Sequence, residues 1–367
     1  MKAVVITRHG INNYGSLLQT MATQAAIESL GHTCEIIDYV RPDEEYRTIE
    51  KTMLAQKPAW NRHPLKRAIY LLIRQPAGVL SGRRFARLTR RYLHLTRRYA
   101  TEAELKADKP AADRYITGSD QVWGPVGRGV RDACYCLSFT DEEDRRFSYA
   151  ASFGHAAFTP ETEAFFRKWL TRYDRILVRE DSAAAAIRSW GLEAEQVIDP
   201  TLLMPGSYWE TYMTAAPKKR YLLIYQIHND PALARYAKRL AKQKGLSLIR
   251  VSPSLHQRFR GGKFVWCPDV GAFLSLIRHA ACLVTDSFHG TAFAVNLNTP
   301  FIEVLPNNDT GTRNESLLRL TGLTDRILTD PEDLGLIDRP IDFERVNRIL
   351  DSERKRSLSL LNEMLRP

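Results

Sequence analysis

The sequence has no long apolar segment. Its longest uninterrupted apolar run covers only residues 68–73, whereas a helix needs about 20 predominantly apolar residues to span a bilayer. The first residues, MKAVVITRHG, also lack the apolar stretch of a signal peptide. We therefore expect a cytoplasmic protein with no transmembrane helix.

Cysteine is scarce, and no two cysteines form a CxxC pair. The chain has 5 cysteines in 367 residues, an odd number that favours reduced thiols over a disulfide framework. Cys134 and Cys136 are close enough in sequence to chelate a metal together. Two ligands without nearby partners do not complete a tetrahedral zinc site, so we expect neither a metal nor another bound cofactor.

Several catalytic motifs are missing. The chain contains no HExxH, GxSxG, GxxxxGK[ST] or Asp-x-Asp sequence, and its first loop lacks GxGxxG. These absences argue against zinc proteolysis, α/β-hydrolase chemistry and P-loop phosphoryl transfer. They also argue against dinucleotide binding and against a nucleotide sugar held through a metal.

Acidic residues are absent from one long segment. Residues 51–101 contain thirteen Lys and Arg and no Asp or Glu, while the rest of the chain has 40 basic and 42 acidic residues. Within it, residues 60–99 interleave arginine and lysine with Leu, Ile, Tyr and Trp, a pattern typical of a cationic amphipathic helix on an anionic membrane. The alternative is a solvated, arginine-rich surface. A nucleic-acid binder would use the same charges, but its aromatic platforms and motifs are missing, so we expect no nucleic-acid partner.

The remaining pattern alternates apolar strands with helices. Strands are predicted at 3–8, 34–40, 114–117, 147–152, 175–178 and 196–198, and then at 221–227, 247–251, 263–266, 282–285 and 300–305. Helices are predicted at 16–30, 160–173 and 181–190, and then at 231–245, 270–280, 290–297, 315–320 and 343–365. Alternation of this kind is typical of parallel α/β sheets.

We predict two Rossmann-like, doubly wound α/β domains followed by a C-terminal helix. The first covers residues 1–205 and includes the basic insertion 51–101, the second covers 206–340, and the helix lies in 341–367. In such folds ligands bind at the carboxyl ends of the strands, and the cleft between two domains is the default site.

One candidate site follows the strand CLVTD. Ser287 is positioned to cap the next helix, and the first amides of that helix, including those of Gly290 and Thr291, would form a seat for an anion. His289 would project from the first turn as a candidate acid. The alternative is a capped helix whose histidine is buried and hydrogen-bonded.

Two arginines are candidate anion ligands. Arg179 follows the strand RILV, and Arg313 lies in the polar segment NNDTGTRNES. A guanidinium at either position can bind a carboxylate or phosphate through two parallel hydrogen bonds. For Arg179, an ion pair with Glu180, Asp181 or Asp199 is an equally good explanation.

Two polar loops are candidate sugar sites. The first contains Asn13, Tyr14 and Gly15 in a tight turn before a helix. The second, GSDQVWG at 118–124, combines hydrogen-bonding side chains with an indole, a mixture that suits a sugar, and Asp120 could deprotonate a hydroxyl. The alternative for the second loop is an Asx-type turn with Trp123 in the core.

Six blocks, in the same order, resemble the polysaccharide pyruvyl transferase family. They are INNYGSLLQTMATQ, YITGSDQVWGP, RRFSYAASFG, ILVREDSAAAAIRSWGLEAEQVIDPTLL, LVTDSFHGTAFAVNLNTPFIEV and TRNESLLRLTGLTDRI, and they extend from residue 12 to residue 327. The resemblance implies a fold similar to the two-domain glycosyltransferase B type. It also implies transfer of the enolpyruvyl group of phosphoenolpyruvate onto two hydroxyls of one sugar, giving a cyclic ketal and phosphate.

The resemblance assigns roles to particular residues. The family's His and Arg correspond here to His289 and Arg179, but some branches carry an arginine where this chain has Ser287. The missing charge must come from other residues, with Arg179 and Arg313 as the first candidates and Arg8 after them. The expected phosphoenolpyruvate-binding residues are Arg179, Arg313, Ser287, Gly290, Thr291 and Arg8, the expected acceptor-binding residues are Asn13, Tyr14, Gly15, Ser119, Gln121 and Trp123, and the expected catalytic residues are His289 and Asp120.

The expected acceptor is a sugar or a lipid-linked oligosaccharide of a bacterial-type polysaccharide. A lipid diphosphate at the cytoplasmic leaflet would bring the enzyme to the inner face of the plasma membrane, where the segment 60–99 could bind. A rival hypothesis is a nucleotide-sugar glycosyltransferase of similar architecture, in which Glu303 would contact a ribose.

Overall fold

The computed structural model describes residues 1–124, 131–155, 157–215, 217–306 and 311–366. The chain divides into two compact units. Unit 1 consists of Met1–Pro200 together with Arg356–Pro367, and unit 2 consists of Thr201–Lys355. Each unit is an α/β structure built on its own parallel sheet, which confirms the predicted fold class.

Unit 1 contains a seven-stranded sheet in the order β3-β2-β1-β4-β5-β6-β7. Every pairing in it is parallel. The central strand β1 is entirely apolar after its first residue and its last four residues are buried, as expected for a parallel strand covered on both faces. The strands are β1 (Lys2–Ile6), β2 (Thr33–Tyr39), β3 (Leu95–Tyr99), β4 (Arg114–Asp120), β5 (Arg146–Ala151), β6 (Arg175–Val178) and β7 (Glu195–Gln196).

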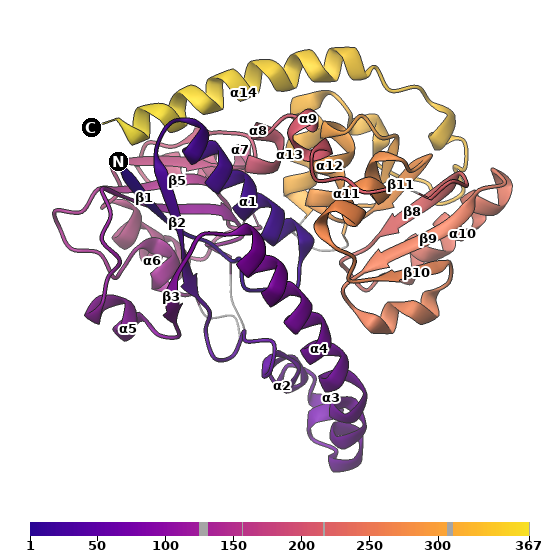
Figure 1. Ribbon diagram of the computed structural model, residues 1–367, viewed down its shortest axis with the longest axis horizontal. Helices are drawn as coiled ribbons and strands as arrows, with labels where there is room; N and C mark the ends of the chain where they lie inside the picture. Colours follow the sequence, from indigo (N-terminus) through magenta and orange to yellow (C-terminus); the bar gives the residue numbers. More distant parts are fainter. Residues whose placement is uncertain (125–130, 156, 216, 307–310, 367) are drawn as a thin grey trace. The chain divides into compact units, whose positions relative to one another are not determined.

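The helices of unit 1 include the crossovers of this sheet and an inserted group of three, α2 to α4. Figure 1 shows α4 extending away from the sheet, with α2 and α3 packed at its far end. The helices are α1 (Tyr14–Ser29), α2 (Ile49–Ala55), α3 (Pro58–Asn61), α4 (Pro64–Tyr92), α5 (Glu102–Ala107), α6 (Pro160–Leu170) and α7 (Asp181–Ser189). A short 3-10 helix, η2, covers Ala133–Cys136.

Local sequence explains where these helices begin and end. The side chain of Asn13 caps α1 by accepting a hydrogen bond from the amide of Gly15 at 2.8 Å. Gly191 follows α7 with φ +83°, a left-handed conformation that glycine adopts without strain.

Unit 2 contains a five-stranded parallel sheet in the order β10-β9-β8-β11-β12. The strands are β8 (Tyr221–Tyr225), β9 (Ser247–Ser252), β10 (Lys263–Trp266), β11 (Cys282–Thr285) and β12 (Phe301–Glu303). The helices that begin at or after Pro200 are α8 (Pro200–Leu203), α9 (Gly206–Glu210), α10 (Pro231–Gln243), α11 (Val270–Arg278), α12 (Phe288–Asn296), α13 (Thr312–Thr321) and α14 (Phe343–Leu365), with 3-10 turns η3 (Leu255–Arg260), η5 (Thr324–Arg326) and η6 (Leu336–Asp338).

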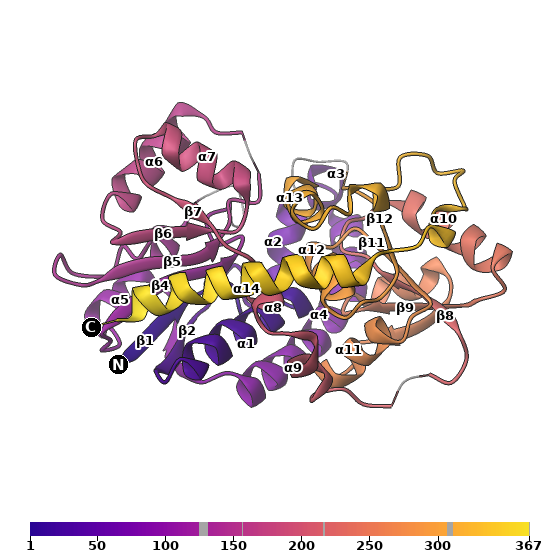
Figure 2. The ribbon, with the colours of Figure 1, turned by 90° about the horizontal axis from the view of Figure 1, so that it is seen from above.

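The last helix, α14, begins in unit 2 and ends in unit 1. It is one continuous helix in Figure 2, and its limits match the prediction. Val346 and Leu350 are buried in its first half, and Leu361 and Leu365 are buried in its second half. In unit 1, Arg114 of β4 donates to the carbonyl of Met364 at 3.2 Å, which fixes the end of the helix beside the sheet.

One part of the basic segment is not helical. Residues 60–99 were expected to form an amphipathic helix, but α4 ends at Tyr92 and Leu95–Tyr99 form the edge strand β3, paired with β2. In the strand LTRRY, Tyr99 is buried and the neighbouring Arg97 and Arg98 are both exposed, so charged side chains lie at this sheet edge and oppose pairing with another strand.

No helix among the described residues is long and apolar enough to cross a membrane. The five cysteines are all buried thiols. The described ranges contain no group of three or more His, Cys, Asp or Glu arranged to hold a metal ion.

Candidate functional site

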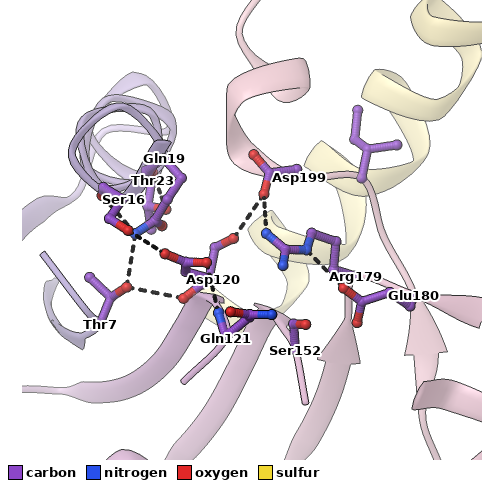
Figure 3. A network of polar contacts seen from close by, with 12 residues as sticks. Thr7, Ser16, Gln19, Thr23, Asp120, Gln121, Ser152, Arg179, Glu180 and Asp199 are labelled. Carbon is purple, nitrogen blue, oxygen red and sulfur yellow. Dashed lines mark hydrogen bonds and ion pairs between the residues drawn. The ribbon is translucent and has the colours of Figure 1, made fainter. Parts of the chain in front are cut away.

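In unit 1 the polar residues gather where the strand order reverses. The chain places β2 and β3 on one side of β1 and β4 to β7 on the other, so β1 and β4 flank the switch point where open α/β sheets bind ligands. Thr7 follows β1 and Asp120 ends β4. Figure 3 shows these two residues within a connected polar network.

Asp120 is held in place from two directions. The hydroxyl of Ser16 donates to its Oδ2 at 2.5 Å, and the amide of Gln121 donates to its Oδ1 at 2.8 Å. The backbone of Asp120 has φ +69°, and a non-glycine residue in this region indicates a conformation that the surrounding structure imposes. The carboxylate is therefore fixed at the carboxyl edge of the sheet.

Further hydrogen bonds link β1, α1 and β4. Gln19 donates to the hydroxyl of Thr7 at 2.9 Å, and Thr7 donates to the carbonyl of Ser119 at 3.0 Å. The hydroxyl of Ser119 in turn donates to Asp199 at 3.2 Å. The network thus connects the start of α1 to Asp199, which lies between β7 and α8 (Figure 3).

Arg179 is neutralised by neighbouring carboxylates. Its guanidinium donates to Glu180 at 3.0 Å and to Asp199 at 2.9 Å, and all three side chains are almost fully buried. Burial works against the charge, but Glu180 and Asp199 raise the pKa of Arg179 above its usual value. The ion-pair alternative is therefore present, and a bound anion would have to compete with two carboxylates.

Two expected acceptor ligands belong to the core instead. Trp123 is 1% exposed, its indole donates to the carbonyl of Tyr135 at 3.0 Å, and its ring packs on Phe153. Tyr14 is fully buried with its ring against Phe85. Neither ring has exposed surface on which a sugar could stack, because both rings fill the core behind their loops.

The other predicted acceptor residues differ in exposure. Ser119 and Gly15 are buried, whereas Asn13 and Gln121 are partly exposed. Gln121 lies against Gly154, where an added Cβ would meet the Gln121 amide nitrogen at 2.3 Å. Asn13 and Gln121 are therefore the two predicted acceptor residues with exposed surface in this part of unit 1.

Arg8 is also engaged. It donates to Glu44 at 2.6 Å. Burial opposes its charge, yet Glu44 raises the pKa of Arg8 above its usual value. This guanidinium is thus paired internally, as Arg179 is.

Unit 1 also has a cavity of about 440 Å³ beneath α4. His9 and Asp38 line it, with Nε2 of His9 3.1 Å from Oδ1 of Asp38. Arg90 and Arg98 line the same cavity. We had not predicted this site: His9 follows the first strand, as other candidates follow theirs, but it carried no recognisable motif.

In unit 2 the strand order reverses between β8 and β11. A cavity of about 280 Å³ opens there, lined by residues that follow β8, β11 and β12, among them His228, Asp286 and Val304. The carboxylate of Asp286 accepts from the amides of Ile227 at 2.7 Å and His228 at 3.0 Å. We did not predict His228 or Asp286, although Asp286 directly follows the apolar strand β11 and His228 comes three residues after the apolar strand β8.

The α12 segment begins beside this cavity. The Ser287 hydroxyl accepts from the amide of Gly290 at 3.2 Å, which confirms the cap. The amide of Thr291 donates to the Ser287 carbonyl at 2.9 Å. These two amides are used within the helix cap and do not form an open anion seat. His289 sits in the first turn and is 6% exposed.

Glu303 lies behind α12. It is fully buried at the end of β12, accepts from Asn314 at 2.6 Å and also accepts from the hydroxyl of Thr291. Burial raises the pKa of Glu303 to about 8, because the hydrogen bonds from Thr291 and Asn314 only partly offset the loss of water. The Thr291 side chain, an expected phosphoenolpyruvate ligand, is thereby directed toward Glu303.

Arg313 and His289 both lie next to the Phe288 ring. The Arg313 guanidinium is 5.8 Å from the centre of the Phe288 ring, and the same ring is 5.1 Å from the centre of the His289 ring. Arg313 is partly exposed. Among the predicted arginines it is the one in the same unit as His289.

A second arginine of unit 2 was not predicted. Arg250 in β9 is fully buried and donates to Gln226 at 3.0 Å. Burial lowers the pKa of Arg250 to about 10, with a further contribution from Arg260. Within the described residues its Nη2 has no hydrogen-bond partner. Arg250 lies inside the predicted strand 247–251, but arginine side chains are mostly exposed in proteins, so we did not predict its burial.

Comparison with known proteins identifies the family and the fold class. A family model described as polysaccharide pyruvyl transferase matches residues 13–309. No curated protein matches the chain significantly.

Solved structures resemble the chain over nearly its full length. UDP-GlcNAc 2-epimerase from Neisseria meningitidis bound to UDP-GlcNAc has 11% identity and a TM-score of 0.51, covering 100% of this chain and 99% of its own. Arabidopsis thaliana UGT89C1 complexed with UDP-L-rhamnose has 10% identity and a TM-score of 0.51, covering 99% and 98%. These likenesses show a glycosyltransferase-B-like fold.

Proposed function

The chain belongs to the polysaccharide pyruvyl transferase family, and on that premise we propose that it transfers the enolpyruvyl group of phosphoenolpyruvate onto two hydroxyls of one sugar. The products are a cyclic pyruvate ketal and free phosphate. The family match over residues 13–309 carries this proposal. The polar groups at the carboxyl edges of both sheets support it.

The reaction needs one proton donor and one proton acceptor. The methylene carbon of phosphoenolpyruvate gains a proton and becomes a methyl group, which leaves an oxocarbenium-like centre at C2. The first sugar hydroxyl adds to C2 and loses its proton, the bond from C2 to the phosphate oxygen breaks, and the second hydroxyl closes the ketal. Of the two hydroxyl protons, one balances the proton placed on carbon and the other leaves with phosphate or solvent.

We assign the proton donor to His289. The cap formed by Ser287 fixes the first turn of α12 and thereby the histidine. A protonated imidazole is a suitable acid near neutral pH. Arg313, which shares the Phe288 ring with His289, would hold the phosphate or carboxylate of the donor.

Other charges have supporting roles in the proposal. Arg179 and Arg8 would contact phosphoenolpyruvate only by giving up a carboxylate partner. Arg313 takes the main role because it lies in the same unit as His289 and next to the same Phe288 ring. Ser287, Gly290 and Thr291 would position the donor through the start of α12 rather than through open amides.

We assign acceptor binding to unit 1. Asp120 would remove the proton from the attacking hydroxyl, since its carboxylate is held at the sheet edge by Ser16. Asn13 and Gln121 would contact the sugar. The acceptor would be a sugar or lipid-linked oligosaccharide of a bacterial-type polysaccharide, modified in the cytoplasm or at the inner leaflet.

The direct test is phosphate release from phosphoenolpyruvate over a panel of acceptor glycans. We expect release that depends on one acceptor and a product heavier by one pyruvyl group. Release that is independent of any acceptor, or no release with any glycan in the panel while the protein also fails to bind phosphoenolpyruvate, would contradict the proposal.

A nucleotide-sugar glycosyltransferase is the second candidate. It is favoured by solved structures of similar fold that hold UDP-GlcNAc or UDP-L-rhamnose. Thermal shift separates the two functions: phosphoenolpyruvate should raise the melting temperature in the first case, and UDP or GDP sugars should raise it in the second.

A further inference from the structure

The helix α4 exposes an apolar stripe. Leu65, Leu72 and Ile73 are 65%, 77% and 66% exposed, and Ile69 and Leu80 are also exposed. The spacing of these residues, at i, i+4, i+7, i+8 and i+15, places them on one side of a helix. Single exposed apolar residues are ordinary on a protein surface. Five on one side of one helix form an apolar surface of the kind that marks an interaction site.

The opposite side of α4 holds the helix to unit 1. Tyr70 donates to Glu50 at 3.1 Å, and Ser81 accepts from Asn12 at 3.3 Å. The Phe85 ring packs on Tyr14. The apolar stripe therefore faces away from the contacts that anchor the helix.

Arginines continue the same stripe along the helix. Arg83, Arg87 and Arg91 follow Leu65, Ile69 and Ile73 by eighteen residues, which is about five turns, so each lies in line with its apolar counterpart. All three arginines are exposed. One side of α4 is thus apolar over its first half and cationic over its second half.

We propose that this side of α4 docks on an anionic phospholipid membrane. The apolar half would enter the boundary between headgroups and acyl chains, and the arginines would contact lipid phosphates.

The charge distribution favours a membrane over a second copy of the chain. Residues 51–101 carry thirteen basic and no acidic residues. Two such segments facing each other would repel, whereas an anionic leaflet attracts each of them. A purely solvated arginine surface would not explain the exposed leucines and isoleucines.

Vesicle co-sedimentation tests this proposal without depending on pyruvyl transfer. The full chain is mixed with vesicles of phosphatidylcholine alone or of phosphatidylcholine with phosphatidylglycerol. We expect binding to the anionic vesicles only. Leu72→Gln with Ile73→Gln should weaken that binding by roughly tenfold or more, because two exposed apolar side chains no longer enter the lipid.

The charged half has a matched control. Arg83→Glu with Arg87→Glu should weaken binding to anionic vesicles by at least roughly tenfold. Lys238→Glu with Lys242→Glu on α10 makes the same change in charge at the same spacing on an exposed helix, and should leave most of the binding intact. Phe259→Gln, which removes an 88% exposed ring from unit 2, should also retain binding.

Several results would overturn the proposal. One is equal binding to neutral and anionic vesicles, and another is no binding to either. Equal losses in the α4 and α10 charge variants would indicate non-specific attraction. A dimer in light scattering that Leu72→Gln with Ile73→Gln abolishes, without any vesicle binding, would identify a second copy as the occupant.

Discussion

At the scale of single residues, His289 carries the proposed chemistry. His289→Ala should lower turnover by ~10²-fold or more, because a positioned acid contributes that much to proton transfer. Turnover of phosphoenolpyruvate with the active acceptor is the measurement, and unchanged melting would show that the fold is intact. His279→Ala, at an exposed histidine of the same unit, is the matched control. Near-normal turnover in His289→Ala would remove its role as the acid.

Glu303 should make stability depend on pH. Burial raises its pKa from 4.5 to about 8 in the folded state. Between these values the unfolded chain releases a proton that the folded protein keeps, so the free energy of unfolding falls as pH rises, by at most about 1.4 kcal/mol per unit. The contribution is complete below pH 4.5 and lost by about pH 8.

Glu303→Gln removes this titration while keeping a polar side chain beside Thr291 and Asn314. Urea unfolding of both proteins at several pH values from 5 to 8 should show a flatter profile for the variant. Parallel profiles would show that Glu303 is ionised throughout this range in the folded protein.

The sequence predicted where the candidate site residues lie more accurately than it predicted what each of them does. Asp120 and Arg179 lie at strand ends, and His289 lies in the first turn of the helix after its strand, as their sequence context indicated. Whether Trp123 contacts a ligand or fills the core depends on which side of a turn it occupies, and residues far away in sequence, such as Phe166, decide that. The partners of Arg179 were foreseen only as alternatives because one carboxylate, Asp199, lies on a later segment.

At the scale of elements, the start of α12 offers a test that separates capping from ligand binding. Ser287→Ala should lower the free energy of unfolding by ~1 kcal/mol through loss of the cap. Ser287→Asn and Ser287→Asp should both restore stability, since both side chains cap helices well. If phosphoenolpyruvate binds here, Asp alone should weaken its binding, because it places a negative charge beside an anion. Equal donor affinity in the Asn and Asp variants would place the donor elsewhere.

Elements with a strong apolar period were predicted most closely. The apolar stripe of α14 predicted a helix over 343–365, and the structure has the helix with the same two ends. The strand β3 was missed because LTRRY contains little apolar sequence, and its place comes from pairing with β2. Strand pairing involves residues that are far apart in the sequence, so the local sequence of β3 does not predict it.

At the scale of the whole molecule, the second half of α14 is part of the unit 1 core. Leu361→Ala should lower the free energy of unfolding by ~2–5 kcal/mol, because the side chain is 1% exposed. Leu358→Ala, at a partly exposed position of the same helix, should cost clearly less. Denaturant unfolding measures both, and equal losses would show that Leu361 is not anchored in the core.

The order of the chain has a consequence for biosynthesis. Unit 1 is discontinuous: it consists of Met1–Pro200 and Arg356–Pro367, so unit 2 is inserted within it. On the ribosome, the sheet of unit 1 emerges first but lacks the helix that supplies carbonyls to Arg114 and a hydroxyl to Ile198. Unit 2 is therefore synthesised before Arg356–Pro367, so unit 1 is completed only after unit 2 has been made.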